Sequence, residues 1–274
     1  MLVRLAEAPP LAVAAFRMLA ASALLLPIGL LRAAGEMRKL LQGQWRLLAL
    51  AGVLLALHFA LWISSLSHTS VASSVVLVTT TPLFVALASW ALFRERLRGA
   101  TFAGIAISLV GALFIGYAGL ERGGAALSGN LLALAAAIAM AGYLLVGRRL
   151  RRSAGLLAYS SVVFTVAALV LLCAAIISGT PFTGYGGPTY LAILALALVP
   201  QLVGHMSLNW ALRFLPATMV TVAVLGEPVG ASLLAWAALG EPPTVLEAAG
   251  GVLMMAGIAF AFLRGGTAPS LPTP

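Results

Sequence analysis

Two stretches of this sequence decide its fold: PLFVALASWALFRERLRGATFAGIAISLVG, residues 82–111, and EPVGASLLAWAALGEPPTVLEAAGGVLMMAG, residues 227–257. The second partly repeats the first at an offset of 146 residues. Five residue pairs share this offset: Pro82 and Pro228, Trp90 and Trp236, Glu95 and Glu241, Gly104 and Gly250, Gly111 and Gly257. Both stretches are apolar enough to belong to membrane helices. Two membrane halves related by a repeat are how many transporters build a central binding site.

The composition of the whole chain supports a membrane protein. Of the 274 residues, 62% are hydrophobic and 8% are charged, whereas a soluble domain carries about 25% charged residues. So few polar side chains could not cover a surface of this size in water. Cys173 is the only cysteine, which excludes an intrachain disulfide and a cysteine-rich metal site.

Apolar segments long enough to span a bilayer predict an all-α polytopic membrane protein, since about 20 apolar residues are needed for each span. Nine segments qualify: 11–31, 45–66, 70–93, 100–119, 129–147, 155–178, 188–212, 217–239 and 245–263.

Basic residues alternate across the loops between these segments. Only Arg4 and Arg122 fall on one side, and Arg17 lies inside the first span. The other side holds Arg32, Arg38, Lys39, Arg46, Arg94, Arg96, Arg98, Arg148, Arg149, Arg151, Arg152, Arg213 and Arg264. Cytoplasmic loops are enriched in Lys and Arg, so we expect the C-terminus in the cytoplasm. The net charge of +9 is then a topology signal, and it requires no nucleic-acid partner.

The repeat also predicts how the two halves are organised. Subtracting 146 maps segment 155–178 onto 11–31, but it maps segment 129–147 to positions before Met1. We therefore expect a ten-helix fold with five helices in each half, of which the first has been lost by truncation or by a start codon placed too far downstream. A genuine nine-helix protein is the alternative. An odd number of helices per half makes the repeat inverted.

Segments 82–111 and 227–257 both resemble the closing motif of the EamA domain, and the stretch PPLAVAAFRMLAASALLLP, residues 9–27, resembles its second helix. The resemblance implies the drug/metabolite transporter superfamily, whose members have two five-helix domains and export amino acids, other metabolites or toxic compounds. The expected domains are a first EamA repeat at 1–120, a second at 129–264, and a disordered tail at 265–274.

Polar residues on one face of segment 188–212 are the main candidates for a substrate site. Gln201, His205 and Asn209 are four residues apart and follow Pro200, which is expected to kink the helix. The equivalent face of segment 45–66 carries His58 and Trp62. Polar groups at this depth are costly and tend to face a cavity. The alternative is that they bond neighbouring helices and hold the bundle together.

Charged residues inside the spans are further candidates. Glu227 is the only acidic residue well inside a span, and its repeat partner is Thr81. A carboxylate at this depth suits a proton-coupling or substrate-binding residue, or it caps backbone groups freed by Pro228. Arg17 could contact a substrate carboxylate, although snorkelling to the interface is the preferred expectation.

Other positions complete the expected site. Thr81 and Tyr143 could line the cavity, and Pro82, Pro200 and Pro228 are candidate hinges. Hydroxyls such as that of Thr81 could instead bond to their own helix backbone. The glycines at 104, 111, 250 and 257 are expected to serve only close helix packing.

Motifs of several enzyme classes are missing from the sequence: it has no GxxxxGK loop, no HExxH motif, no GxSxG motif and no aspartate. We expect no catalytic residue, no metal and no cofactor. The sequence predicts a secondary transporter in the bacterial inner membrane, an exporter of small metabolites such as amino acids, working by alternating access. Its partners would be the substrate, the lipid bilayer and, as a candidate coupling ion, the proton. The alternative is a non-transporting membrane subunit or a lipid-modifying protein.

Overall fold

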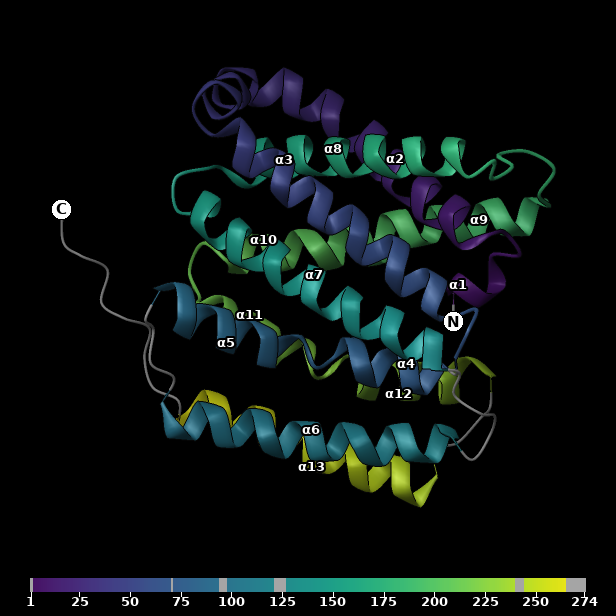
Figure 1. Ribbon diagram of the computed structural model, residues 1–274, viewed down its shortest axis with the longest axis vertical. Helices are drawn as coiled ribbons and strands as arrows, with labels where there is room; N and C mark the ends of the chain where they lie inside the picture. The colour runs from purple at the N-terminus through teal and green to yellow at the C-terminus, as the bar shows by residue number, and fades with distance from the viewer. Residues whose placement is uncertain (1, 70, 94–97, 121–126, 240–243, 265–274) are drawn as a thin grey trace.

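The computed structural model describes residues 2–69, 71–93, 98–120, 127–239 and 244–264, and all regular structure in them is helical (Figure 1). The helices are α1 (Leu2–Leu5), α2 (Pro10–Arg32), α3 (Ala34–Ser65), α4 (Val71–Val78), α5 (Thr81–Phe93), α6 (Gly99–Leu120), α7 (Leu127–Arg151), α8 (Leu156–Ile177), α9 (Gly187–Leu196), the π-helix η1 (Ala197–His205), α10 (Met206–Ala211), α11 (Ala217–Val224), α12 (Glu227–Leu239) and α13 (Val245–Arg264). The expectations for Glu95, Arg122, Glu241 and the tail 265–274 lie outside the described residues.

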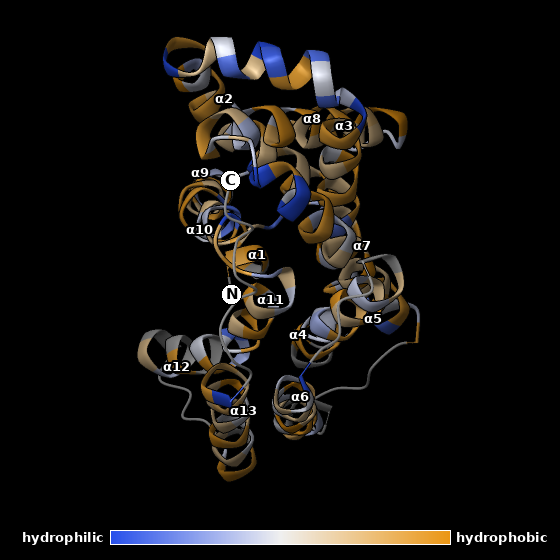
Figure 2. Cartoon of the chain, turned by 90° about the vertical axis from the view of Figure 1, so that its left-hand side faces the viewer, coloured by the Kyte–Doolittle hydropathy of each residue, from blue (hydrophilic) through white to orange (hydrophobic). Residues whose placement is uncertain are grey.

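Nine apolar helical segments of the described chain match the nine expected spans. Six are long and apolar enough to cross a membrane: Pro10–Arg32, Ala34–Ser65, Ser74–Ala91, Leu127–Arg151, Leu156–Ile177 and Gly187–Ala211. Three are shorter: Gly99–Phe114, Ala217–Gly230 and Ala248–Arg264. Hydrophobic residues dominate these helices in Figure 2. The chain is therefore an all-helical, multi-pass membrane protein.

The third span is broken near Pro82, where the sequence predicted a single span over 70–93 with that proline as a candidate hinge. The α-helix stops at Val78 and resumes at Thr81, so the break precedes Pro82. Proline has no N–H to bond the carbonyl four residues back, but it is well tolerated in the first turn of a helix. The hydroxyls of Thr79 and Thr81 bond carbonyls at the break: they donate to Val76 O and to Val78 O, each at 2.7 Å, and Val78 stands four residues before Pro82.

The eighth span breaks at the equivalent point, although the sequence predicted a single helix over 217–239. Here α11 ends at Val224 and α12 begins at Glu227, leaving Leu225 and Gly226 between them. This break lies 146 residues after the one at Thr79 and Thr80. Pro228 stands second in α12, as Pro82 stands second in α5. The same proline rule thus applies in both halves.

The seventh span is continuous but irregular. Between α9 and α10 the chain forms nine residues of π-helix that contain Pro200. A π-helix widens the turn to i→i+5 bonds, and such segments are frequent at functional sites. The expected proline kink of this span therefore takes the form of a π-helical segment. It orients Gln201 and His205 inward, and both are buried.

Helices α6 and α13 lie side by side in Figures 1 and 2 and form the most extensive contact between two helices of the described chain. A Cβ added at Gly104 would lie 2.6 Å from Gly257 O, and one at Gly111 would lie 2.5 Å from Gly250 O. Residue numbers rise along one helix as they fall along the other, so the two helices are antiparallel. The glycines therefore serve close backbone packing, as expected.

Helices α2 and α8 also pack antiparallel, because residue numbers fall along one helix as they rise along the other. Ser161 Oγ donates to Leu25 O at 3.2 Å, and the hydroxyls of Ser22 and Thr165 lie 2.7 Å apart. The larger hydrophobic core surrounds this pair together with α3 and α7. Helix α3 begins at Ala34, earlier than the expected start at residue 45, and it is kinked at Gln44 (φ −137°, ψ 24°).

Candidate functional site

Arg17 lies in the interior of the bundle, 1% exposed. Its Nε donates to Gln201 Oε1 at 3.2 Å, and its guanidinium carbon lies 4.1 Å from the centre of the Phe59 ring. The preferred expectation that Arg17 snorkels to the membrane interface is therefore wrong. The reason is local: the amide on η1 and the ring face on α3 both receive the guanidinium.

Two histidines, one from each half, meet beside this arginine. The ring centres of His58 and His205 lie 6.3 Å apart, and the Phe59 ring meets His205 edge-on at 5.1 Å. We call Arg17, His58, Phe59, Gln201 and His205 the central cluster. His58 Nδ1 donates to Ala136 O at 3.1 Å, since a carbonyl can only accept.

Several nitrogens in and beside the central cluster have no hydrogen-bond partner among the described residues. They are Arg17 Nη1, Gln201 Nε2, His205 Nδ1 and, on the neighbouring turn of α3, Trp62 Nε1. The Trp62 ring stacks on His58 at 6.1 Å. A buried donor without an acceptor costs about 1–3 kcal/mol. Such a group of unpaired nitrogens makes this cluster the candidate ligand site.

Three other expected site residues already have protein partners. Tyr143 Oη donates to Asn209 Oδ1 at 2.6 Å, and Asn209 Nδ2 donates to Ser160 Oγ at 3.3 Å. Thr81 Oγ1 donates to Val78 O at 2.7 Å. Tyr143 still approaches the central cluster, because its ring centre lies 6.4 Å from that of His205.

Glu227 opens α12 directly after the helix break, where a negative charge is favoured by the helix dipole. It is exposed, and the described residues give its carboxylate no hydrogen bond or ion pair. It nevertheless interacts electrostatically with Arg17. The carboxylate and the guanidinium therefore share one electrostatic environment without touching. The alternative that Glu227 caps freed backbone groups finds no hydrogen bond in support among the described residues.

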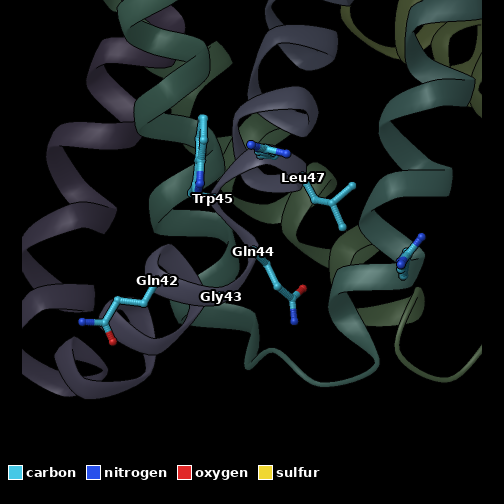
Figure 3. A pocket seen from close by; sticks show the side chains of 7 residues that line it. Gln42, Gly43, Gln44, Trp45 and Leu47 are labelled. Atoms are coloured by element: carbon cyan, nitrogen blue, oxygen red, sulfur yellow. The ribbon is translucent and has the colours of Figure 1, made fainter.

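A cavity of about 570 Å³ lies elsewhere, on both sides of the α3 kink. It is lined by Gln42, Gly43, Gln44, Trp45, Arg46, Leu47 and Arg149. Figure 3 shows Gln42 and Gln44 pointing in different directions from the kinked turn. None of the expected site residues lines this cavity, so it is separate from the central cluster.

Phe59 is the central-cluster residue that the sequence did not predict. It contacts both Arg17 and His205. Its only sequence signal is its position next to His58, because an aromatic residue in a membrane span is most often a packing residue. Among the described residues, no three His, Cys, Asp or Glu side chains come together as a metal site would require.

The two halves of the chain each match the model of one protein family. That family is the EamA-like transporter family, and the matched residues are 1–117 and 127–263. The chain belongs to the EamA-like transporter family. Its members are transporters and not enzymes, which removes the alternatives of a lipid-modifying protein and a non-transporting subunit.

Relatives and a solved structure agree with this family. The chain is 31% identical over 248 residues to the uncharacterized inner membrane transporter YedA of Escherichia coli K12, a match of 87% of this chain and 77% of that protein. It is 28% identical over 192 residues to the uncharacterized transporter YdfC of Bacillus subtilis, a match of 69% of this chain but only 61% of that protein's length. A crystal structure with 23% identity shares the fold, with a TM-score of 0.81 over 95% of this chain and 90% of the other.

Proposed function

We propose that this EamA-family protein is a secondary transporter that exports a small organic metabolite, such as an amino acid, by alternating access between two inverted repeats, residues 1–120 and 129–264. The observation that carries the proposal is the central cluster. It joins His58 of the first half to His205 of the second, with unpaired nitrogens beside both. A site built at the junction of two halves can be exposed to each side of the membrane in turn.

The packing of equivalent helices supports inversion. Helix α13 is the repeat partner of α6, and the two run antiparallel. The contact of Gly104 with Gly257 has its mirror in the contact of Gly250 with Gly111, since both pairs follow the 146-residue offset. Such reciprocal contacts are characteristic of a two-fold axis. An axis between antiparallel helices lies in the membrane plane, as alternating access requires.

The expected site residues have different roles in this proposal. Arg17, Gln201, His205 and Trp62 contact the substrate, because each has an unpaired nitrogen. Tyr143 and Asn209 bond each other and position η1 and α10 against α7. His58, bonded to Ala136 O, positions the ring of His205.

Movement around the site would occur at the helix irregularities. The breaks before Pro82 and Pro228 and the π-helix around Pro200 leave the backbone short of regular α-helical bonds. Glu227 stands next to the second break and is our candidate for proton coupling. Thr81, its repeat partner, opens α5 directly after the first break and bonds across it to Val78 O of α4.

The proposed location is the bacterial inner membrane, with the C-terminus in the cytoplasm. The excess of basic residues in one set of loops supports this orientation. The similarity to the inner membrane transporter YedA supports the membrane.

Counterflow in vesicles tests the proposal. The purified full chain is reconstituted into liposomes loaded with one unlabelled metabolite at a time, and uptake of the same labelled compound is measured. We expect at least one small metabolite to accumulate transiently, as a carrier requires. If no compound in a panel of amino acids and other small metabolites shows counterflow, the proposed function is wrong.

Two matched variants connect transport to the site. His205→Leu should reduce counterflow, whereas His68→Leu should not, because His68 is exposed in the turn after α3. Export, as opposed to import, is tested in cells loaded with a dipeptide of the transported compound. Overexpression should speed the release of the free compound into the medium.

A further inference from the structure

Gln201 is held in one orientation by Arg17. The Arg17 Nε can only donate a hydrogen bond, so the atom facing it at 3.2 Å must be the amide oxygen of Gln201. The Gln201 Nε2, with two N–H groups, therefore points away from Arg17 and has no partner among the described residues. Arg17 Nη1, on the guanidinium, likewise has no hydrogen-bond partner among the described residues.

These two side chains are deeply buried, with 1% exposure for Arg17 and none for Gln201. Both unpaired atoms are obligatory donors, and so is Trp62 Nε1. His205 Nδ1 can donate or accept, depending on its tautomer. The chemistry that the site lacks is therefore a hydrogen-bond acceptor and not another donor.

The charge of the site selects which acceptor it binds. A buried guanidinium is costly unless an anion compensates it, and no described carboxylate forms an ion pair with Arg17. Glu227 interacts with it electrostatically but without a direct contact. An arginine fork with an adjacent amide matches the two coplanar oxygens of a carboxylate. One guanidinium partly offset by Glu227 does not suit a dianionic phosphate.

We propose that Arg17 and Gln201 form a carboxylate-binding subsite, so that the transported molecule is an organic monocarboxylate held by its carboxylate on α2 and η1. That the bound molecule is transported rests on the proposed function, whereas its binding at this subsite does not. The Phe59 ring lies beside the guanidinium, with its centre 4.1 Å from the guanidinium carbon, and so covers one side of the subsite. His205, edge-on to the same ring, contributes the next polar contact to the ligand.

The closed state of the central cluster is consistent with this subsite. With Arg17 and Gln201 both out of contact with solvent, a ligand reaches them only when η1 moves relative to α2. Among the described residues, one hydrogen bond joins these two elements, from Arg17 to Gln201. A carboxylate would bind both side chains. The single hydrogen bond between Arg17 and Gln201 would then be replaced by several charge-assisted hydrogen bonds to the ligand.

Paired ligands test the subsite on the purified full chain in detergent. The panel consists of neutral L-amino acids, 2-hydroxy acids and aromatic monocarboxylates, each beside its own primary amide. Binding is measured by isothermal titration calorimetry and by the shift in unfolding temperature. We expect every compound that binds the wild-type protein to bind at least tenfold more tightly as the carboxylate than as the amide.

Two variants locate that preference at the subsite. Arg17→Gln should reduce the preference for carboxylate over amide to within about twofold, whereas Arg32→Gln, at the exposed end of the same helix, should leave it unchanged. Gln201→Glu should pair Arg17 internally, abolish carboxylate binding and raise the unfolding temperature. A purely structural role of Gln201 predicts the opposite, a lower unfolding temperature with both ligand forms affected alike.

The outcomes separate this inference from the proposed function. If counterflow occurs but carboxylate and amide bind equally, or if no carboxylate of the panel binds, the subsite is refuted and the transporter remains. Tighter binding of inorganic phosphate than of any carboxylate refutes it as well. If carboxylates bind through Arg17 but no compound shows counterflow, the subsite stands and the proposed transport fails.

Discussion

Helix α3 and the continuous span formed by α9, η1 and α10 are repeat partners, yet they differ in almost every physical respect. Helix α3 is α-helical through its membrane portion, and α7 packs along it. The partner span contains a π-helix, and 28% of its most apolar stretch is buried, against 44% for α3 and 56% for α7. His58 on α3 has a backbone partner, whereas His205 on η1 has an unpaired Nδ1.

This difference indicates that equivalent positions in the two halves have different roles. Contacts that hold the halves together are reciprocal, as in the glycine pairs of α6 and α13. Contacts suited to a ligand are concentrated on η1 of the second half and on Arg17 of the first. At the histidine position, the first half thus supplies a paired side chain, and the second supplies an unpaired one on a less regular backbone.

The two histidines give the strongest test of this division. His205→Leu should lower the transport of the compound found by counterflow about thirtyfold, because a hydrogen bond to a charged ligand is worth about 2 kcal/mol. His58→Leu should instead lower stability by about 1–3 kcal/mol, since Ala136 O loses its buried donor. Transport kinetics and unfolding in detergent measure the two effects.

Each histidine variant serves as the control for the other. The division between framework and site holds only if His205→Leu leaves the unfolding temperature within about 2 °C of the wild type. Equal losses of stability in both variants would show that the two halves are physically alike at this position.

The shared packing should respond symmetrically. Gly111→Ala and Gly257→Ala should each lower the free energy of unfolding by about 1.5 kcal/mol, because a Cβ at either position meets opposing backbone at 2.5–2.6 Å. Gly35→Ala is the matched control, with nothing within 4 Å of the added Cβ. Unfolding in detergent measures all three, and a loss at only one of the two packed glycines would contradict a two-fold contact.

Sequence patterns predicted most of the fold because the responsible forces act locally. Apolar segments about 20 residues long predicted nine helical segments, of which six in the described chain are long and apolar enough to cross a membrane. The 146-residue offset predicted the close packing of Gly104 and Gly111, although it could not give their antiparallel register against Gly257 and Gly250. The positions of the breaks were harder to predict: the prolines marked their neighbourhood, but the helix is interrupted two or three residues earlier, at Thr79 and Thr80 in one half and at Leu225 and Gly226 in the other.

The sequence predicted which residues gather in the central cluster better than it predicted their contacts. Gln201 and His205 were found because polar groups at this depth are costly. The burial of Arg17 was missed, since snorkelling depends on whether a neighbouring helix offers a partner. Phe59 was missed because packing aromatics and ligand-site aromatics look alike in a sequence. Only the three-dimensional contacts distinguish the paired amide of Asn209 from the half-paired amide of Gln201.

The π-helix can be altered by one substitution. Pro200→Ala restores an N–H that can bond Leu196 O, which favours a regular α-helix and turns Gln201 and His205 relative to Arg17. We expect KM to rise and the transport rate to fall, each by about fivefold, which corresponds to about 1 kcal/mol. The free energy of unfolding should be unchanged or higher. Concentration-dependent counterflow measures this.

Pro188→Ala is the control for Pro200→Ala, because Pro188 stands exposed in the first turn of α9, where proline is well tolerated. It should leave KM unchanged. A Pro200→Ala protein with wild-type KM would show that the π-helix does not set the geometry of the site.

The smallest effect is expected where the two halves differ by one charge, at Thr81 and its partner Glu227. Glu227→Gln should change transport at neutral pH by only about twofold, a difference of about 0.4 kcal/mol, but should flatten the dependence of counterflow on pH between 5.5 and 8. The reason is that Glu227 is exposed at a helix break and is electrostatically linked to Arg17, so a proton on it would change the charge of the site. Thr81→Val removes only an uncharged hydroxyl, which bonds Val78 O of α4 and Ala137 O of α7, and should retain the wild-type profile. His58 and His205 are the two imidazoles of the central cluster, beside Arg17. An unchanged pH profile in Glu227→Gln would exclude coupling through the carboxylate and would leave these two histidines as the groups to test.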